Sequence, residues 1–153
     1  MQVSQKCQYA ARAVFELARR QGDGPVTIGE IARIQAIPQK FLEVILGELK
    51  QTGYVASRRG VQGGYLLEVS PEVLTVGDVV RFIDGPLDPV KCIGPEIGAE
   101  AASTCPLKGD CAFMGLWARA GEAVAGVYDS TTFQDLIDEH EAATQEYVPH
   151  YNI

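Results

Sequence analysis

The apolar positions at the start of the chain predict three helices that share one core. Ser4 is a suitable N-cap for the first helix, which ends near Gly22–Pro25, and Thr27 caps a shorter second helix. The third helix begins at Pro38 and ends after Lys50. The apolar residues recur three and four positions apart, as in amphipathic helices: Tyr9, Ala10, Ala13, Val14, Leu17 and Ala18; Ile28, Ile31, Ala32 and Ile34; Phe41, Leu42, Ile45, Leu46 and Leu49.

A basic, glycine-rich turn lies between two short strand-like segments after the third helix. The segments are Tyr54–Ser57 and Tyr65–Val69, and the turn runs from Arg58 to Gly64. A helix-turn-helix followed by a hairpin with a cationic tip predicts a winged helix. Its third helix would enter the major groove of DNA, and its arginines would reach phosphates or the minor groove. A plain surface hairpin is the alternative, since glycine-rich turns are common.

Polar residues on the first turns of the third helix are candidates for contacts with base edges. Gln can pair with adenine, Lys with guanine, and Glu can accept from cytosine. An acid that faces phosphates is unfavourable unless a base donates to it, so Glu43 is expected to discriminate between sequences; the alternative is a solvated helix face. The candidate DNA-binding residues are Thr27, Gln39, Lys40, Glu43, Arg58 and Arg59.

The second half predicts a short helix over Thr75–Asp84, a loop over Leu87–Asp110 and two later helices, the last capped by Thr132. A long apolar stripe late in a small domain predicts a symmetric dimer, in which two winged helices read a roughly palindromic site. In the alternative, the stripe packs on the chain's own winged helix. The apolar residues are Val76, Val79, Val80, Phe82 and Ile83; Phe113, Leu116, Trp117, Ala120, Val124 and Val127; and Phe133, Leu136 and Ile137.

These elements predict a mainly α fold with a small two-stranded β wing and a long C-terminal dimerisation helix. Residues 1–70 are assigned to the winged helix-turn-helix. Residues 71–153 hold the sensor loop, about residues 85–111, and the dimerisation helix. At 153 residues, we expect both regions to form one compact unit.

Charge is distributed unevenly along the chain, whose formal net charge is −7. Residues 1–67 contain nine Lys and Arg against five Asp and Glu, whereas residues 68–153 contain four against fifteen. A basic first half and an acidic second half fit a DNA reader joined to a sensing or dimerising half, although acidic surfaces also serve solubility. We assign to the exposed surface of the first helix, away from its apolar face, the residues Arg12, Glu16, Arg19 and Arg20.

No apolar run approaches the roughly 20 residues of a membrane span, and the N-terminus lacks the features of a signal peptide. We therefore expect a cytoplasmic protein without a membrane partner. Its four cysteines are then expected to be reduced thiols or metal ligands.

Three cysteines surround the predicted loop, spaced Cys92-x12-Cys105-x5-Cys111. Three thiolates on one loop suit zinc or an iron–sulfur cluster, although the lack of a CxxC pair argues against a zinc ribbon. Cys7 either approaches the loop of a partner chain in a dimer or is a small buried side chain. No histidine falls in the loop and no catalytic arrangement is visible, so an enzyme is not expected.

The whole chain resembles Rrf2-type transcriptional regulators. The resemblance rests on Tyr9–Ala13, Ile37–Glu43, Arg59–Tyr65 and the cysteine loop running into Leu116–Trp117. Members of this family are homodimeric winged-helix DNA-binding proteins. Many hold a [2Fe-2S] or [4Fe-4S] cluster in this loop and sense cluster supply, nitric oxide or redox state. The resemblance implies that Cys92, Cys105 and Cys111 hold a cluster and that Arg59 contacts DNA.

The chain departs from the family pattern at the fourth cluster ligand. One branch has a histidine three residues after the last cysteine, where this chain has Met114. Another has an acid near the start of the first helix, where this chain has Gln8 next to Cys7. The interval between Cys92 and Cys105 is also longer than in the best-known cluster members. We expect Cys7 of the partner subunit to complete the cluster, with Gln8 or a water as the alternatives.

The implied function is a homodimeric regulator that binds double-stranded DNA with an affinity set by the cluster. We expect [2Fe-2S] rather than [4Fe-4S], in a form that air handling can remove. One alternative is a cluster-free regulator that uses its cysteines as a thiol switch or zinc site. Others are a winged helix that binds a partner protein, and an enzyme or electron carrier.

Overall fold

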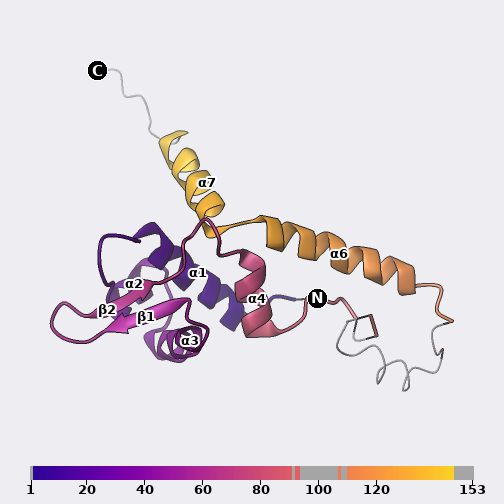
Figure 1. The fold of residues 1–153 in the computed structure, drawn as a ribbon, viewed down its shortest axis with the longest axis horizontal. Coiled ribbons are helices and arrows are strands. Elements are labelled where there is room, and N and C mark those ends of the chain that lie inside the picture. Colours follow the sequence, from indigo (N-terminus) through magenta and orange to yellow (C-terminus); the bar gives the residue numbers. More distant parts are fainter. Residues whose placement is uncertain (1, 91, 94–106, 108–109, 147–153) are drawn as a thin grey trace.

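The computed structural model describes residues 2–90, 92–93, 107 and 110–146, which form six helices and a two-stranded sheet (Figure 1). The helix-turn-helix and its wing come first, and three helices follow. Their bounds are α1 (Gln5–Arg19), α2 (Ile28–Ile34), α3 (Gln39–Gln51), β1 (Val55–Arg58), β2 (Gly64–Leu67), α4 (Val76–Asp84), α6 (Met114–Ser130) and α7 (Phe133–Glu146). The predicted mainly α fold with a small β wing is confirmed.

Side-chain caps begin four of the described helices. At Ser4, Thr27 and Thr132, the hydroxyl accepts a hydrogen bond from the backbone N–H three residues later, as the sequence predicts for N-caps. Thr75 forms a capping box with Asp78, so it is the N-cap of α4 rather than its first residue. Each cap satisfies a backbone N–H group in the first turn of its helix.

One buried cluster joins the helix-turn-helix, the wing and the start of α7. Phe133 and Ile137 of α7 belong to the same cluster as Leu17 of α1 and Leu46 of α3. Helix α7 accordingly packs on α1. The core therefore continues across residue 70, and the division of the chain into two regions there stays a prediction.

Two backbone hydrogen bonds fasten the wing to the segment before α2. Val26 and Tyr65 exchange N–H···O=C bonds of 2.8 Å in each direction. Gly64 allows this approach, because a Cβ at that position would lie 2.5 Å from the carbonyl oxygen of Val26. The antiparallel strands pair with Val55 opposite Leu67. The wing is therefore held at a fixed place beside the helix-turn-helix.

Some boundaries and burial assignments differ from the prediction. Strand β1 begins one residue later and β2 ends two residues earlier than predicted, and Pro38 is the N-cap of α3. Phe41 and Phe82 were placed on apolar faces, but they are 62% and 39% exposed. Phe41 lies at the rim of its helix, where its ring is 6.5 Å from that of Tyr9. Periodicity alone does not show how wide the covered face of a helix is.

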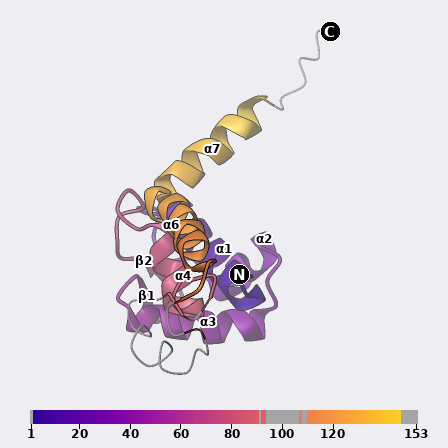
Figure 2. The ribbon, with the colours of Figure 1, turned by 90° about the vertical axis from the view of Figure 1, so that its right-hand side faces the viewer.

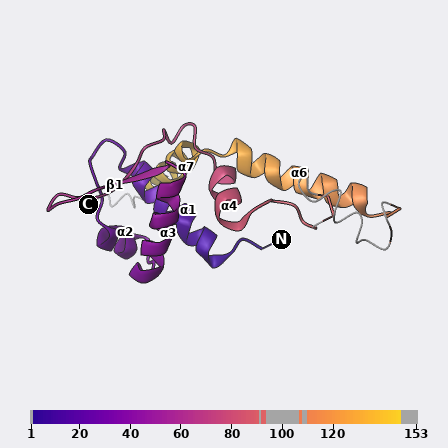
Figure 3. The same ribbon diagram turned by 60° about the horizontal axis from the view of Figure 1, so that its bottom comes forward.

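Helix α6 extends away from the winged helix, and its N-terminal half reaches beyond the helices around it (Figures 1 and 3). Near its other end, the Arg81 guanidinium of α4 donates to both carboxylate oxygens of Asp129 and lowers the pKa of that carboxyl. Helix α7 leaves the domain in another direction (Figure 2). Within the described residues, no helix has the length and apolar character needed to span a membrane.

Candidate nucleic-acid interface and cysteine loop

Helix α3 exposes the polar residues that the sequence assigns to DNA. Gln39, Lys40 and Glu43 are all exposed. The rotation of the helix is fixed by a buried face that consists of Leu42, Ile45, Leu46 and Leu49. The three polar side chains are therefore accessible to a groove, and their contacts with bases stay predictions.

A buried carboxylate holds both ends of α2. Glu16 is 1% exposed, and its carboxylate accepts from Nε of Arg20 at 3.0 Å and from Nε2 of Gln35 at 2.9 Å. The Arg20 guanidinium also donates to Glu30 at 2.8 Å. Since Glu30 lies in the first turn of α2 and Gln35 caps its end, this network fixes α2 against α1. The expectation that Glu16 is exposed was wrong, because α2 and the turn after it cover a side of α1 that is not its apolar face.

The wing presents two accessible arginines. Arg58 ends β1 and Arg59 follows it in the turn; both are exposed and neither forms an ion pair within the described residues. Nζ of Lys50 donates to Oγ of Ser57 at 2.7 Å, which ties the end of α3 to the wing. Thr27, the remaining candidate, is exposed at the start of α2. The structure thus places the predicted DNA-binding residues on α2, α3 and a wing that are joined by direct bonds.

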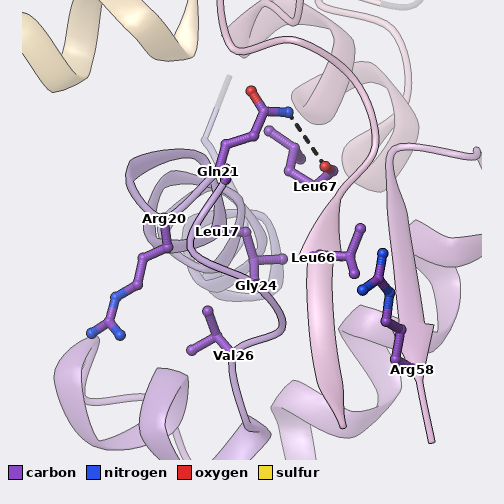
Figure 4. Close-up of a pocket in the computed structure, with 9 residues that line it drawn as sticks. Leu17, Arg20, Gln21, Gly24, Val26, Arg58, Leu66 and Leu67 are labelled. Atoms are coloured by element: carbon purple, nitrogen blue, oxygen red, sulfur yellow. Dashed lines mark hydrogen bonds between the residues drawn. The ribbon is translucent and has the colours of Figure 1, made fainter. Parts of the chain in front are cut away.

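A pocket of about 220 Å³ lies between the wing and the loop after α1 (Figure 4). Arg20 and Arg58 lie on opposite sides of it, but Arg20 is already paired with two carboxylates. Nε2 of Gln21 donates to the carbonyl oxygens of Leu67 at 3.3 Å and Val69 at 3.0 Å. These bonds tie the loop to the sheet. Apolar side chains complete the lining: Leu17, Val26, Leu66 and Leu67.

Two of the three loop cysteines lie in the described part of the chain. Cys92 is exposed and Cys111 is half-buried, one near each end of the segment that joins α4 to α6. Cys105 lies outside the described residues. Among the residues described, no three His, Cys, Asp or Glu side chains come together in a way that could hold a metal ion. The predicted ligand set therefore stays a prediction.

Cys7 is buried inside its own subunit. It is fully covered and packs in a small cluster with Val80 of α4 and with Leu87. This burial, together with the nearby Asp84 carboxylate, raises the pKa of the Cys7 thiol to about 12. A metal ligand must be a thiolate, so this geometry favours the alternative in which Cys7 is a small buried side chain.

Asp84 joins the end of α4 to the start of α1. Its carboxylate accepts from the backbone N–H of Ser4 at 2.8 Å and from the Ser4 hydroxyl. Asp84 is the last residue of α4, and the connection to the cysteine loop begins directly after it. The sequence did not predict this contact, because the two residues are 80 positions apart and the N-cap role of Ser4 does not indicate a partner on α4.

The apolar stripe of α6 is largely uncovered. Phe113 is 59% exposed, Leu116 46%, Trp117 37% and Val127 62%. The alternative in which the stripe packs on the chain's own winged helix therefore fails for these four residues. A concentration of exposed apolar side chains on one helix is typical of an interaction surface.

Comparisons with known proteins agree with this architecture. The family described as "Rrf2: Iron-dependent Transcriptional regulator" matches residues 3–139. The transcriptional regulator CymR of Bacillus subtilis is 32% identical over 148 residues, which cover 97% of this chain and 98% of that protein. IscR of Erwinia tasmaniensis is 30% identical over 141 residues, which cover 92% of this chain and 81% of that protein.

A solved structure supports the same assignment. It is described as CymR, the global cysteine regulator of B. subtilis, and has a TM-score of 0.73 and 34% sequence identity. The match covers 91% of this chain and 98% of that one. All of these relatives are named as regulators and none as an enzyme. The chain therefore belongs to the Rrf2 family of winged helix-turn-helix transcriptional regulators.

Proposed function

We propose that this regulator is a homodimer that reads a roughly palindromic operator and whose DNA affinity is controlled by an iron–sulfur cluster at the cysteine loop. The observation that carries the sensing part is the placement of Cys92 and Cys111. They are accessible thiols near the two ends of the segment between α4, which packs on α1, and the long helix α6. A change in this segment can therefore act on both halves of the molecule.

In the proposed complex, α3 lies in the major groove and the wing follows the backbone. Gln39, Lys40 and Glu43 contact base edges, while Arg58 and Arg59 reach phosphates or the adjacent minor groove. The exposure of all five side chains supports this assignment. Thr27, at the start of α2, completes the interface.

The uncovered stripe of α6 supports the homodimer. If the α6 helices of two subunits pack on each other around a twofold axis, the same apolar residues of both subunits become buried, as in other isologous interfaces. This packing would also set the two α3 helices at one fixed spacing, which a palindromic operator requires. The stripe consists of Phe113, Leu116, Trp117, Ala120, Val124 and Val127.

The thiols at the loop ends fit a cluster in their chemistry and accessibility. Cys92, Cys105 and Cys111 would hold it through sulfur, and when bound it would supply iron whose charge depends on its redox state. Cys7 does not fit, since it is enclosed in its own subunit and burial raises the pKa of its thiol to about 12. The fourth donor is then the exposed Gln8 or a water.

Anaerobic purification tests the cluster. We expect a coloured protein with matching iron and sulfide per chain, and we expect Cys92→Ser to lose both and to change DNA affinity. A colourless protein after anaerobic reconstitution, or a Cys92→Ser variant unchanged in cluster content and DNA binding, would refute the sensing proposal.

DNA binding is tested separately by its salt dependence. We expect affinity to fall steeply with salt, and Arg58→Ala and Arg59→Ala each to reduce the salt slope of the dimer by about 2, one for each half-site. Binding that does not respond to salt would refute the phosphate contacts whatever the metal content is.

A cluster-free regulator is the second candidate. The exposed Cys92 and the lack of a fitting ligand at Cys7 favour it, and a similar structure is described as a global cysteine regulator. Zinc in place of iron, or reversible loop oxidation that changes DNA affinity in a metal-free protein, would support this candidate over the cluster.

A further inference from the structure

The outward face of α3 is bare and apolar at its centre. Lys40, Val44, Gly47 and Gln51 recur at helical spacing on the side away from the core, and all four are exposed. Val44 is 58% exposed and belongs to no core cluster. A single exposed apolar side chain is ordinary on a protein surface. Its meaning here depends on what lies beside it.

Gly47 lies one turn further along the same face and has no role in the packing of the chain. Glycine is among the poorest residues for the interior of a helix. A Cβ built at Gly47 would meet no atom within 4 Å, so the fold leaves ample room for a side chain. No contact within this subunit therefore requires glycine at position 47. Glycine is, however, the residue that lets another molecule approach the backbone of a helix closely.

Phe41, the other exposed apolar residue of α3, is explained differently. Its ring lies 6.5 Å from that of Tyr9 on α1, at the side of the helix rather than on its outward face. Val44 and Gly47 are thus left between Lys40 and Gln51 as a short apolar strip. The strip is continuous with Glu43, the proposed base reader, and it belongs to the basic half of the chain.

In the major groove, one chemical group matches this strip. Among the four base-pair orientations, thymine alone presents a methyl group, and apolar side chains recognise it by contact. We propose that Val44 contacts the 5-methyl group of a thymine in each half-site and that Gly47 allows α3 to approach the bases closely enough for this. The inference rests on the proposed DNA-reading role of α3 and adds a specificity-determining residue to it.

The test is a double-mutant cycle that measures the coupling between the Val44 side chain and one thymine methyl group. The operator is first selected from random duplexes with the full-length protein. Each thymine of one half-site is then replaced by deoxyuridine, which lacks only the methyl. We expect one such replacement to weaken binding about fourfold, as for the loss of one buried methyl group. In Val44→Ala, the same replacement should have little effect, because the contact is already lost.

Val73→Ala is the matched control. Val73 is 68% exposed but lies on the segment before α4. This variant should respond to deoxyuridine as the unmodified protein does. Equal deoxyuridine effects in the unmodified protein and Val44→Ala, or no effect at any thymine, would overturn the inference while DNA binding stands. Failure to bind any duplex at low salt would refute the DNA-reading proposal itself, and this inference with it.

Discussion

Gly47→Ala is expected to stabilise the protein and to weaken its DNA binding. Position 47 is exposed within α3, and a Cβ there would meet no atom within 4 Å. The substitution therefore removes the helix penalty of glycine without a steric cost. Alanine is about 1 kcal/mol more favourable than glycine in a helix interior. At a fixed protein concentration, this gain should raise the Tm by roughly 2–4 °C for a chain of 153 residues.

The effect on DNA binding should have the opposite sign. If α3 approaches the bases closely at Gly47, the added methyl group must displace the helix or a base. Overpacking by one methylene in a well-packed interior costs about 1–3 kcal/mol. The expected loss of affinity for the selected operator is therefore at least about fivefold.

Thermal unfolding and fluorescence anisotropy with the selected operator measure the two effects. Gly126→Ala is the matched control, since Gly126 is also an exposed helical glycine with nothing within 4 Å of a Cβ. It lies on α6, on the side away from the apolar stripe. It should raise the Tm similarly and leave affinity unchanged. Gly47→Ala with a raised Tm and unchanged affinity would refute the close approach, and a lowered Tm would refute the exposure of this face.

Three further predictions concern buried groups. Glu16→Ala should lower the free energy of unfolding by about 1.5–3 kcal/mol in urea titrations, because it removes the buried carboxylate that accepts from Arg20 and Gln35; a loss below 0.5 kcal/mol would contradict the network. Phe133→Ala should cost about 3–5 kcal/mol, since the ring is fully buried; a near-neutral result would mean that α7 does not complete the core. Iodoacetamide at pH 8 should label Cys92 and Cys111 in the folded, metal-free protein but not Cys7. The thiol of Cys7 is covered and has a pKa raised to about 12. Rapid labelling of Cys7, measured by mass spectrometry, would show that this thiol is accessible.

The fold was predictable because its signals are local. Helical spacing of apolar residues, N-cap hydroxyls and a glycine-rich basic turn act within a few positions of one another, and together they specify a winged helix-turn-helix. The caps at Ser4, Thr27 and Thr132 were all found in this way. Boundaries shifted by one or two residues, as expected where a cap and a first helical residue have similar sequence preferences.

For the candidate site, the sequence could predict which side chains are exposed, and their contacts with DNA stay predictions. The exposure of Gln39, Lys40 and Glu43 was predictable because the polar and apolar pattern of the helix is visible in the sequence. The burial of Glu16 was not predictable, since it depends on Arg20 and on Gln35, which the fold brings to it. The surroundings of Cys7 likewise depend on α4 and on Leu87, which are remote in sequence and carry no motif.

Similar long-range contacts connect the start of the cysteine loop to α3, the helix proposed to read DNA. Leu87, on the way to Cys92, covers Cys7 at the start of α1, and the carboxylate of Asp84 holds the backbone and hydroxyl of Ser4. At the other end of α1, the Glu16 network holds α2 and the turn that leads into α3. A tenfold change in DNA affinity requires a coupling free energy of about 1.4 kcal/mol. One hydrogen bond to a charged group contributes about 1.5–3 kcal/mol. Because the contact between Asp84 and Ser4 is exposed to water, its loss or gain contributes less than this range and does not by itself supply a tenfold change.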